Sequence, residues 1–244
     1  MSTPVVYKAK RKELLALIQA RKFSGNKLPT EEALTQMLSC SRGMLREILR
    51  DLELNGYITK KHSIGNFIHP SSFKMKSRIE IYSRFLDLIS DAGYEASVKL
   101  LYSDPEHTQS PKLAKYRIDP AFFHSTDYTE RLYLAGDHPA IFCECFVPRD
   151  IIIRDIEDQN ARITLFNFLR TYCNQEIQQI HIHFSIELAD ERIANILDVE
   201  PGKPLYLWEE GFHNYCDELI CASYNYFNLD LVPLSMLKIF QTPV

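Results

Sequence analysis

The sequence predicts an α+β protein with two domains, an N-terminal winged helix-turn-helix and a larger, mainly antiparallel sheet with helices. A length of 244 residues suits two domains better than one or three. Hydrophobic residues recur at helical spacing before residue 54, and short alternating segments dominate after residue 96. We expect the winged helix in residues 1–70, a linker in 71–78 and the second domain in 79–244.

Charge divides the chain at the same place. Residues 1–78 contain 15 Lys and Arg against 6 Asp and Glu, a net charge of +9, whereas the remaining residues contain 13 against 26, a net charge of −13. Such asymmetry suggests a basic module that binds a polyanion, joined to an acidic domain. Chance clustering of solvated charges is the alternative.

Composition excludes several classes of protein. A hydrophobic content of 45% and a charged content of 25% are typical of a globular chain. No run of 18 apolar residues and no secretory signal is present, so we expect a cytoplasmic protein that does not enter a membrane. The six cysteines lack C-x-x-C spacing, which favours reduced thiols over a metal site.

Three helices are expected in the basic segment. The first covers about 7–20, where leucine and isoleucine alternate with Lys and Arg. Thr30 is a candidate N-cap for a helix over 31–38, and Ser41 for a helix that runs to about Leu54 before Gly56 ends it. Two short strands, 57–61 and 66–68, then form a wing with Lys60 and Lys61 near its tip.

The third helix has two different sides. One side is an apolar stripe, and the other presents Arg42, Arg46 and Arg50 at spacings of four residues. Guanidinium groups in such a row can contact base edges or phosphates. An ordinary solvated helix surface remains the alternative, because Glu47, Asp51 and Glu53 are available as ion-pair partners.

The basic segment resembles the winged-helix domain of GntR-type regulators. The resemblance rests on Leu28-Pro29-Thr30-Glu31, Ser41-Arg42, Leu45-Arg46-Glu47, Leu52, Gly56 and Gly65-Asn66-Phe67-Ile68. It implies that the start of the third helix and the wing lie against DNA. The candidate DNA-binding residues are Thr30, Ser41, Arg42, Gly43, Arg46, Arg50, Lys60, Lys61 and Gly65. Glu32, Gly43 and Ser63 depart from common forms of this family, which points to an unusual operator.

The acidic segment alternates short strands with helices. We expect helices over 82–93, 163–172 and 190–197, and strands over 97–103, 128–135, 141–147, 178–188, 205–212 and 219–227. Antiparallel hairpins with helices between them predict an α+β domain large enough to enclose a pocket.

This order resembles the UTRA ligand-sensing domain, which accompanies GntR winged helices in the HutC-like subfamily. The matching stretches include Glu130 to Ala140, Phe146-Val147-Pro148, Ala189 to Arg192 and Glu200 to Leu205. The resemblance implies a chorismate-lyase-like fold, a small anionic metabolite as ligand (an organic acid, a phosphonate or a sugar phosphate) and assembly as a homodimer.

Pocket residues are inferred from the same resemblance. Arg131 matches an arginine that meets the ligand's anionic group, and a planar cation suits a carboxylate or phosphate. Tyr133 stands where a second arginine serves sugar phosphates, which favours a singly charged carboxylate or a compact phosphonate. Ser97, Glu144 and Tyr224 are further candidates. A surface ion pair for Arg131, a core-edge hydroxyl for Tyr224 and strand pairing for Ser97 remain the alternatives.

Two other patterns are weaker. His181 and His183 share one face of a strand, which can begin a metal site, but hydrogen-bonded histidines are favoured. Cys143 and Cys145 also share a strand face, and buried packing is favoured over redox sensing.

The sequence thus predicts a transcription factor that responds to a small molecule, acts as a repressor and binds a near-palindromic double-stranded DNA operator as a dimer. No catalytic residue, metal or cofactor is expected, because no nucleophile motif or phosphate loop is present. An effector-independent DNA-binding protein is the main alternative, and a lyase-type enzyme that uses the C-terminal pocket is the second.

Overall fold

A computed structural model describes residues 3–81, 84–108, 118–156 and 158–240 of the protein. The chain forms two compact units. The first contains the chain as far as Ile81 and the segment from Ser235 onward, and the second runs from Tyr82 to Leu234. Within the described residues, no helix has both the length and the apolar character needed to cross a membrane.

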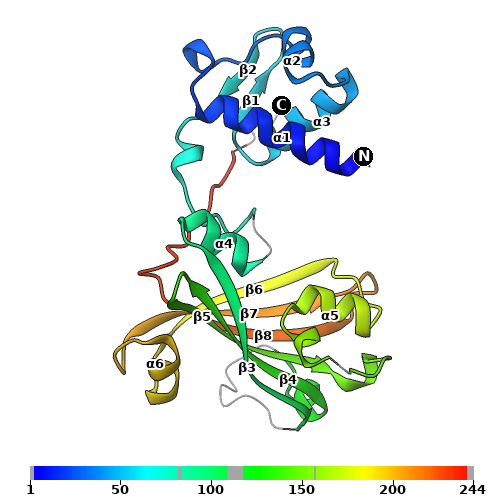
Figure 1. Ribbon diagram of the computed structural model, residues 1–244, viewed down its shortest axis with the longest axis vertical. Helices are drawn as coiled ribbons and strands as arrows, with labels where there is room; N and C mark the ends of the chain where they lie inside the picture. The colour runs from blue at the N-terminus through cyan, green and yellow to red at the C-terminus, as the bar shows by residue number, and fades with distance from the viewer. Residues whose placement is uncertain (1–2, 82–83, 109–117, 157, 241–244) are drawn as a thin grey trace. The chain divides into compact units, whose positions relative to one another are not determined.

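The first unit is a winged helix-turn-helix (Figure 1). Three helices precede a two-stranded antiparallel hairpin, in the order α1 (Thr3–Gln19), α2 (Glu31–Leu38), α3 (Arg42–Leu54), β1 (Ile58–Lys61) and β2 (Gly65–Ile68). The bounds of α2 agree with the prediction, whereas α1 begins four residues before the expected start.

The turn between α2 and α3 follows from the two predicted caps. The Thr30 hydroxyl accepts a hydrogen bond from the Ala33 amide at 3.2 Å, and the Ser41 hydroxyl accepts one from the Met44 amide at 3.2 Å. Each satisfies an amide that has no partner inside its helix. Ser39, in the left-handed conformation at φ 48°, ends α2. Interactions between residues close in sequence therefore set where α2 begins and ends and where α3 begins.

A small core fixes α3 in place. Leu45, Ile48, Leu49 and Leu52 are buried on one side of the helix, as the apolar stripe predicted. They pack with buried residues from the other elements, which are Leu14, Ile18, Leu28, Leu34, Leu38, Ile58 and Ile68. The opposite side of α3 remains exposed.

The segment after the wing also belongs to the first unit. Residues 71–78 were expected to be a linker, but Ser77 and Arg78 are buried here. The Ser235 amide donates to Ser77 O at 3.1 Å, and Ser235 O accepts from the Ile79 amide at 3.0 Å. The last described residues, expected in the second domain, therefore pair with this segment.

The second unit is a six-stranded antiparallel sheet in the order β3-β4-β5-β8-β7-β6. Its strands are β3 (Ala96–His107), β4 (Thr126–Ala135), β5 (His138–Pro148), β6 (Gln179–Leu188), β7 (Pro204–His213) and β8 (Leu219–Phe227). This confirms the predicted α+β class. The insertion of β8 between β5 and β7 joins the two halves of the sheet, and the strand patterns alone did not predict it.

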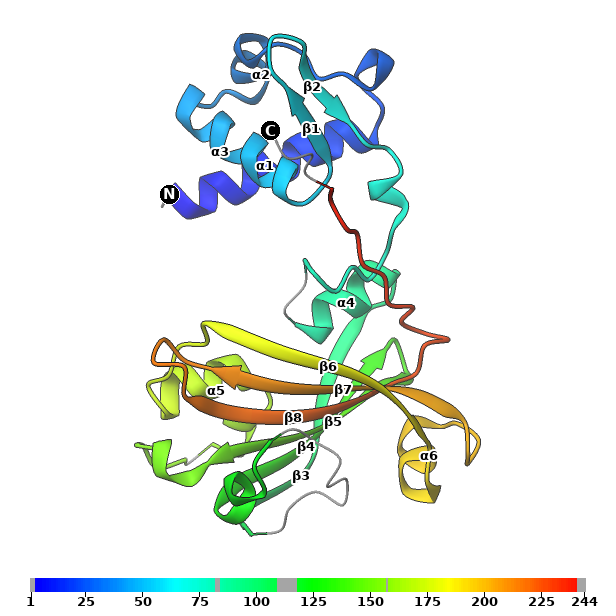
Figure 2. The same cartoon turned by 180° about the vertical axis from the view of Figure 1, so that it is seen from behind.

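Helices cover both faces of this sheet. The helices of the second unit are α4 (Phe85–Ala92), α5 (Leu165–Tyr172) and α6 (Glu191–Leu197). α4 and α6 lie on opposite sides of the sheet in both views (Figures 1 and 2). Phe85 of α4 contacts the rings of Tyr133, Trp208 and Phe227 at centroid distances of 5.3, 6.0 and 5.3 Å. Tyr82, expected in this helix, lies outside the described residues.

The register places a polar row on the face covered by α4 and α5. Arg131 lies opposite Cys143, Cys143 opposite Asn225, and Asn225 opposite Trp208. Two residues further along each strand, Ser223 of β8 lies opposite Glu210 of β7. Side chains alternate between the faces of a sheet, so all of these residues project to the same side.

A buried ion pair anchors a short segment beside that row. The single N–H at Arg162 Nε is shared between Asp127 Oδ1 and Oδ2, at 2.9 and 3.0 Å, and Arg162 Nη2 donates to Oδ2 at 2.6 Å. Asp127 is 2% exposed and Arg162 is 8% exposed. The pair fixes the 3-10 helix Gln159–Arg162, an element that the sequence analysis did not predict.

Replacing Asp127 by Ala leaves the Arg162 guanidinium buried without its counter-ion. We expect the free energy of unfolding to fall by about 3–5 kcal/mol. Urea denaturation followed by the fluorescence of Trp208, the only tryptophan of the chain, measures this loss. Asp230→Ala is the matched control, because Asp230 is 74% exposed in its pair with Lys203 and is worth less than about 1 kcal/mol. Equal losses in both variants would contradict the expectation.

Candidate nucleic-acid interface and effector cavity

The arginine row of α3 is exposed, and Arg46 is its one member that pairs with an acidic residue within the described part of the chain. Asp51 pairs with Arg11 of α1, and Glu53 Oε1 accepts a hydrogen bond from the Lys60 amide at 3.0 Å. Arg42 and Arg50 form no ion pair within the described part of the chain. The geometry therefore favours the predicted interface over the alternative of a helix surface with paired charges.

Glu31 connects the two basic elements of this interface. Arg46 Nε donates to Glu31 Oε2 at 3.0 Å, and Lys60 Nζ lies 3.8 Å from Glu31 Oε1. The first residue of α2 thus holds a side chain of α3 and one of the wing strand together. Glu31 was not among the predicted DNA-binding residues, although its place at the start of the second helix was predicted.

The other predicted DNA-binding residues are three with polar side chains and two glycines. Thr30 and Ser41 are exposed but use their hydroxyls as helix caps, and Lys61 is exposed on β1. The two glycines differ in whether the fold leaves room for a side chain. A Cβ on Gly43 would approach only the Ser41 hydroxyl, at 4.0 Å, whereas Gly65 has φ +126° and a Cβ there would lie 2.7 Å from Lys27 Cε.

Gly65 brings a further basic residue to the wing. Its lack of a side chain lets Lys27 cross the start of β2, where Lys27 Nζ lies 5.7 Å from the centroid of the Phe67 ring. Lys27 was not among the predicted contacts. It adds a cation beside the wing.

The second unit encloses a cavity of about 120 Å³ between the polar row of the sheet and the helices α4 and α5. Most of its walls are apolar, from Leu86, Val98, Ile163, Phe166 and Phe212. The polar groups that the sheet contributes are Arg131, Tyr133, Glu210, Ser223 and Asn225, and the segments around α4 and α5 add Arg84, Thr164 and Asn167. An apolar cavity with a few converging polar groups is the usual form of a small-molecule site.

Arg131 supplies the buried cation of this cavity. It is 1% exposed, and its Nε donates to the carbonyl of Arg162 at 2.7 Å. Its Nη1 has no hydrogen-bond partner among the described residues. A buried donor of this kind is costly to leave unsatisfied, which favours an acceptor supplied by a ligand.

Glu210 and Asn225 supply acceptors in the same cavity. Glu210 Oε2 accepts hydrogen bonds from the Ser223 hydroxyl at 2.9 Å and from Asn225 Nδ2 at 3.0 Å. The Asn225 Oδ1 is buried and has no partner among the described residues. Burial raises the pKa of Glu210 to about 7, although these two hydrogen bonds favour its ionised form. Both residues lie in predicted strands, and neither was among the predicted effector residues.

Three thiols lie beside Arg131. Cys145 Sγ and Cys221 Sγ are 3.4 Å apart, and both residues are fully buried. The hydrogen bond with Cys221, together with the Arg131 guanidinium, lowers the pKa of Cys145. Burial raises the pKa of Cys143, so the thiol that lines the cavity remains neutral. This agrees with the favoured interpretation of buried packing.

The structure brings together two of the five predicted effector residues. Arg131 and Tyr133 line the cavity. Glu144 and Tyr224 project from the opposite face of the sheet, where Glu144 accepts a hydrogen bond from the Tyr128 hydroxyl at 3.0 Å and Tyr224 lies in a fully buried apolar core. Ser97 is next to the lining residue Val98, so its side chain points away from the cavity.

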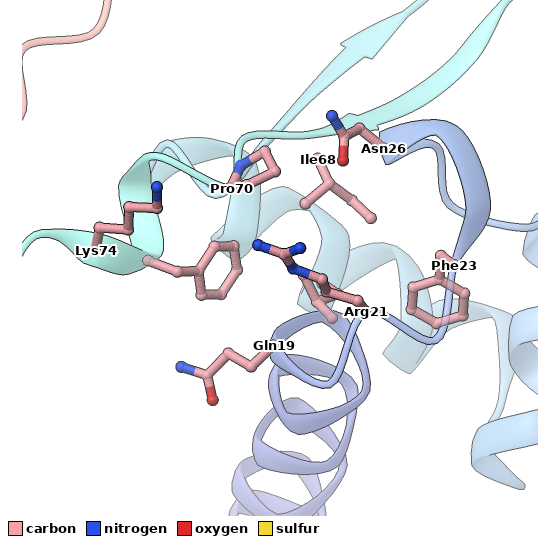
Figure 3. A pocket seen from close by; sticks show the side chains of 9 residues that line it. Gln19, Arg21, Phe23, Asn26, Ile68, Pro70 and Lys74 are labelled. Carbon is pink, nitrogen blue, oxygen red and sulfur yellow. The ribbon is translucent and has the colours of Figure 1, made fainter.

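A second hollow, of about 570 Å³, lies in the first unit between the end of α1 and the base of the wing (Figure 3). Its wall is partly apolar, with Phe23, Ile68 and Pro70, and its cations are Arg21 and Lys74. Both cations are exposed to solvent, so this hollow lacks the buried polar group that distinguishes the cavity of the second unit.

The histidine pair does not form part of either site. His181 contacts His213 in a tilted arrangement, with ring centroids 4.3 Å apart. Among the residues that the structure describes, no three His, Cys, Asp or Glu side chains gather as metal ligands would.

Replacing Glu210 by Gln should remove a pH dependence of stability. Because the pKa of Glu210 is raised from 4.5 to about 7 in the fold, the folded protein binds the proton more tightly than the unfolded chain. The free energy of unfolding of the wild type therefore falls as pH rises through this interval, by about 3 kcal/mol relative to Glu210→Gln. Urea denaturation from about pH 4 to about pH 8 measures the difference. Parallel pH profiles for the two proteins would contradict it.

Comparisons with known proteins cover both units. The UTRA domain family matches residues 92–233, which is more than half of the chain. The structure of YydK from Bacillus subtilis subsp. subtilis str. 168, which its description calls a possible transcriptional regulator, is 20% identical with a TM-score of 0.72 over 96% of this chain and 99% of YydK. PhnF from Mycobacterium smegmatis is 14% identical with a TM-score of 0.52 over 95% of this chain and 99% of PhnF.

A third structure, whose description names the GntR family of transcriptional regulators, is 9% identical with a TM-score of 0.52 over 97% of this chain and 98% of its own. These three likenesses show a shared fold that extends over both units. The match to the UTRA family confirms the resemblance stated from the sequence for the second unit. The chain belongs to the UTRA domain family, with its UTRA domain joined to an N-terminal winged helix-turn-helix.

Proposed function

We propose that the chain is a cytoplasmic transcription factor that binds a near-palindromic DNA operator as a homodimer and is released by a small anionic metabolite. The observation that carries the proposal is the combination of two features in one chain. A basic winged helix presents Arg42, Arg46 and Arg50, and a UTRA domain buries Arg131, whose Nη1 has no hydrogen-bond partner among the described residues. Membership of the UTRA family supports a regulatory role rather than the alternative of a lyase.

The DNA-binding half follows from the geometry of α3. A helix that buries one side in a small core and exposes arginines at its start can enter the major groove. Glu31 holds Arg46 and Lys60 in one arrangement, which reduces the side-chain freedom lost on binding. Lys60 and Lys61 on the wing are placed for the adjacent backbone.

The homodimer is supported by the edge of the sheet. β6 is the last strand of the sheet and pairs only with β7 among the described residues. Phe184, Ile186 and Leu188 on this strand are 48%, 64% and 65% exposed. An exposed apolar edge strand can pair with a strand of another chain. Two copies of β6 related by a two-fold axis present the same surface to each other, so the contact is self-complementary.

Release of the protein from DNA requires that effector binding in the second unit and DNA binding by the first unit are thermodynamically linked. The effector favours one dimer geometry and DNA favours another, so that each weakens the binding of the other, typically by about 1–3 kcal/mol. A repressor output follows when the effector-free dimer is the form that occupies the operator.

DNA binding is tested by fluorescence anisotropy on labelled DNA from upstream of the protein's own gene, with scrambled DNA for comparison. We expect Arg42→Ala and Arg46→Ala each to weaken binding by about 1–3 kcal/mol, because each removes a guanidinium contact. Arg170→Ala is the control, since it removes the same charge from α5 of the other unit. Unchanged affinity in the α3 variants would count against the proposal.

The same assay, repeated with a panel of small anionic metabolites, separates the two candidate functions. Relief of sequence-dependent binding by one compound supports the effector-responsive factor. Equal affinity for both DNAs, insensitive to every compound, would instead favour the effector-independent DNA-binding protein.

Dimer formation is tested by replacing Ile186 with Asp. A charge in an apolar interface should convert the dimer into a monomer in sedimentation equilibrium and weaken binding to a two-half-site operator. Ser185→Asp places the same charge on the opposite face of the same strand and should leave the dimer intact. A dimer that survives Ile186→Asp would exclude this edge as the interface.

A further inference from the structure

The polar groups of the second unit's cavity differ in kind between its two ends. Arg131 on β4 offers a donor, Nη1, that lacks a partner in the described part of the chain. Asn225 on β8 offers an acceptor, Oδ1, that also lacks one, and Glu210 on β7 adds a carboxylate. All three project to one face of the sheet and line one cavity.

The register sets the separation of these groups. Arg131 and Asn225 lie in the same cross-strand row, each opposite Cys143 on the strand between them. Two strand spacings separate their backbones by about 10 Å. The long arginine side chain covers part of this distance, and a compact ligand fills the rest. A cavity of about 120 Å³ agrees with a ligand of this size.

We infer that this cavity takes a small zwitterion, an aminocarboxylate whose carboxylate meets Arg131 and whose ammonium group lies between Glu210 and Asn225. The inference rests on the proposed function and gives the effector a chemical class. It narrows the predicted class of effector from a small anion to a small molecule that carries one negative and one positive charge.

Hydrogen bonding supports the position of the amine. Both recorded hydrogen bonds of Glu210 reach Oε2, and both come from neutral donors, the Ser223 hydroxyl and the Asn225 amide. No cationic side chain of the described residues pairs with this carboxylate. An ammonium group can supply the missing charge and a donor for Asn225 Oδ1 at once.

Charge argues against a ligand that is anionic at both ends. The groups around Glu210 are Arg131 and Tyr133 on β4 and the thiols of Cys143 and Cys145 on β5, with Arg84 at the rim before α4. Arg131 is the one permanent cation among those that are buried. A dianionic phosphate would satisfy Arg131 but would meet the Glu210 carboxylate with like charge.

The inference also predicts proton release. Glu210 is partly protonated near neutral pH because its pKa is about 7. An ammonium group beside the carboxylate favours the ionised form, so binding should expel a proton from Glu210. A ligand that meets only Arg131 has no such effect.

The experiment is isothermal titration calorimetry on the full chain with matched probes. The aminocarboxylates are glycine, β-alanine, 4-aminobutyrate and leucine, and the controls are butyrate, butylamine and 4-methylpentanoate, which lack one of the charges. We expect at least one aminocarboxylate to bind about tenfold or more tightly than its single-charge analogues. Titration in two buffers of different ionisation enthalpy should show proton release for that probe and none for its analogue without the amine.

Glu210→Gln keeps the size of the side chain and removes its charge. In this variant, the aminocarboxylate should lose its advantage over the analogue without the amine, and proton release should vanish. Trp208 fluorescence establishes that the variant is folded. If it does not fold, the comparison of probes on the wild-type protein decides by itself.

Two results would overturn the inference. One is equal affinity for a carboxylate with and without its amine, and the other is binding of none of the aminocarboxylates. The proposed function is separable, because the anisotropy assay on DNA does not depend on the class of ligand. Release from DNA by a different anion would leave the proposed function standing and the zwitterion excluded.

Discussion

The position of Arg131 depends on the ion pair between Asp127 and Arg162. Hydrogen bonds from Nε and Nη2 hold the Arg162 side chain on Asp127, and the Arg162 carbonyl accepts from Arg131 Nε at 2.7 Å. The Nε side of the Arg131 guanidinium is therefore held in place, while Nη1, which has no partner among the described residues, can donate to a ligand. Preorganisation of this kind keeps a cation aimed at a ligand without the loss of side-chain freedom on binding.

The two buried arginines illustrate different uses of the same residue. Arg162 has a carboxylate partner, which is what burial of a charge requires for stability. Among the residues that the structure describes, Arg131 has no carboxylate partner, and it borders the Arg162 carbonyl, three thiols and the cavity. Perturbed charges in a cleft are characteristic of functional sites. The contrast within one face of one sheet supports a structural role for Arg162 and a ligand-binding role for Arg131.

Local signals in the sequence predicted the elements well, and long-range pairing accounts for what they missed. Caps and periodicity located α2 and β8 correctly, because both depend on neighbouring residues. Alternation also showed that Arg131 and Tyr133 share a face. It could not show that Glu144 and Tyr224 lie on the other face, because that depends on the register between β4, β5 and β8. Glu210 and Asn225 were missed for the same reason.

For the candidate DNA interface of the first unit, too, local signals were predictable and contacts between distant residues were not. The arginine row of α3 was predicted from helical spacing alone. The bridge from Glu31 to Arg46 and Lys60 joins three separate elements, so only the folded chain reveals it. Both sites thus rest on residues visible in the sequence and on partners supplied by tertiary structure.

We propose that occupation of the Arg131 cavity and binding of DNA are linked, so the coupling must be the same when it is measured from either site. The affinity of the tightest-binding cavity ligand should be measured by calorimetry with the free protein and with the protein saturated by operator DNA. We expect the ligand to bind the DNA-bound protein more weakly, by the same factor by which the ligand weakens DNA binding. Equal ligand affinity in the two states would contradict it.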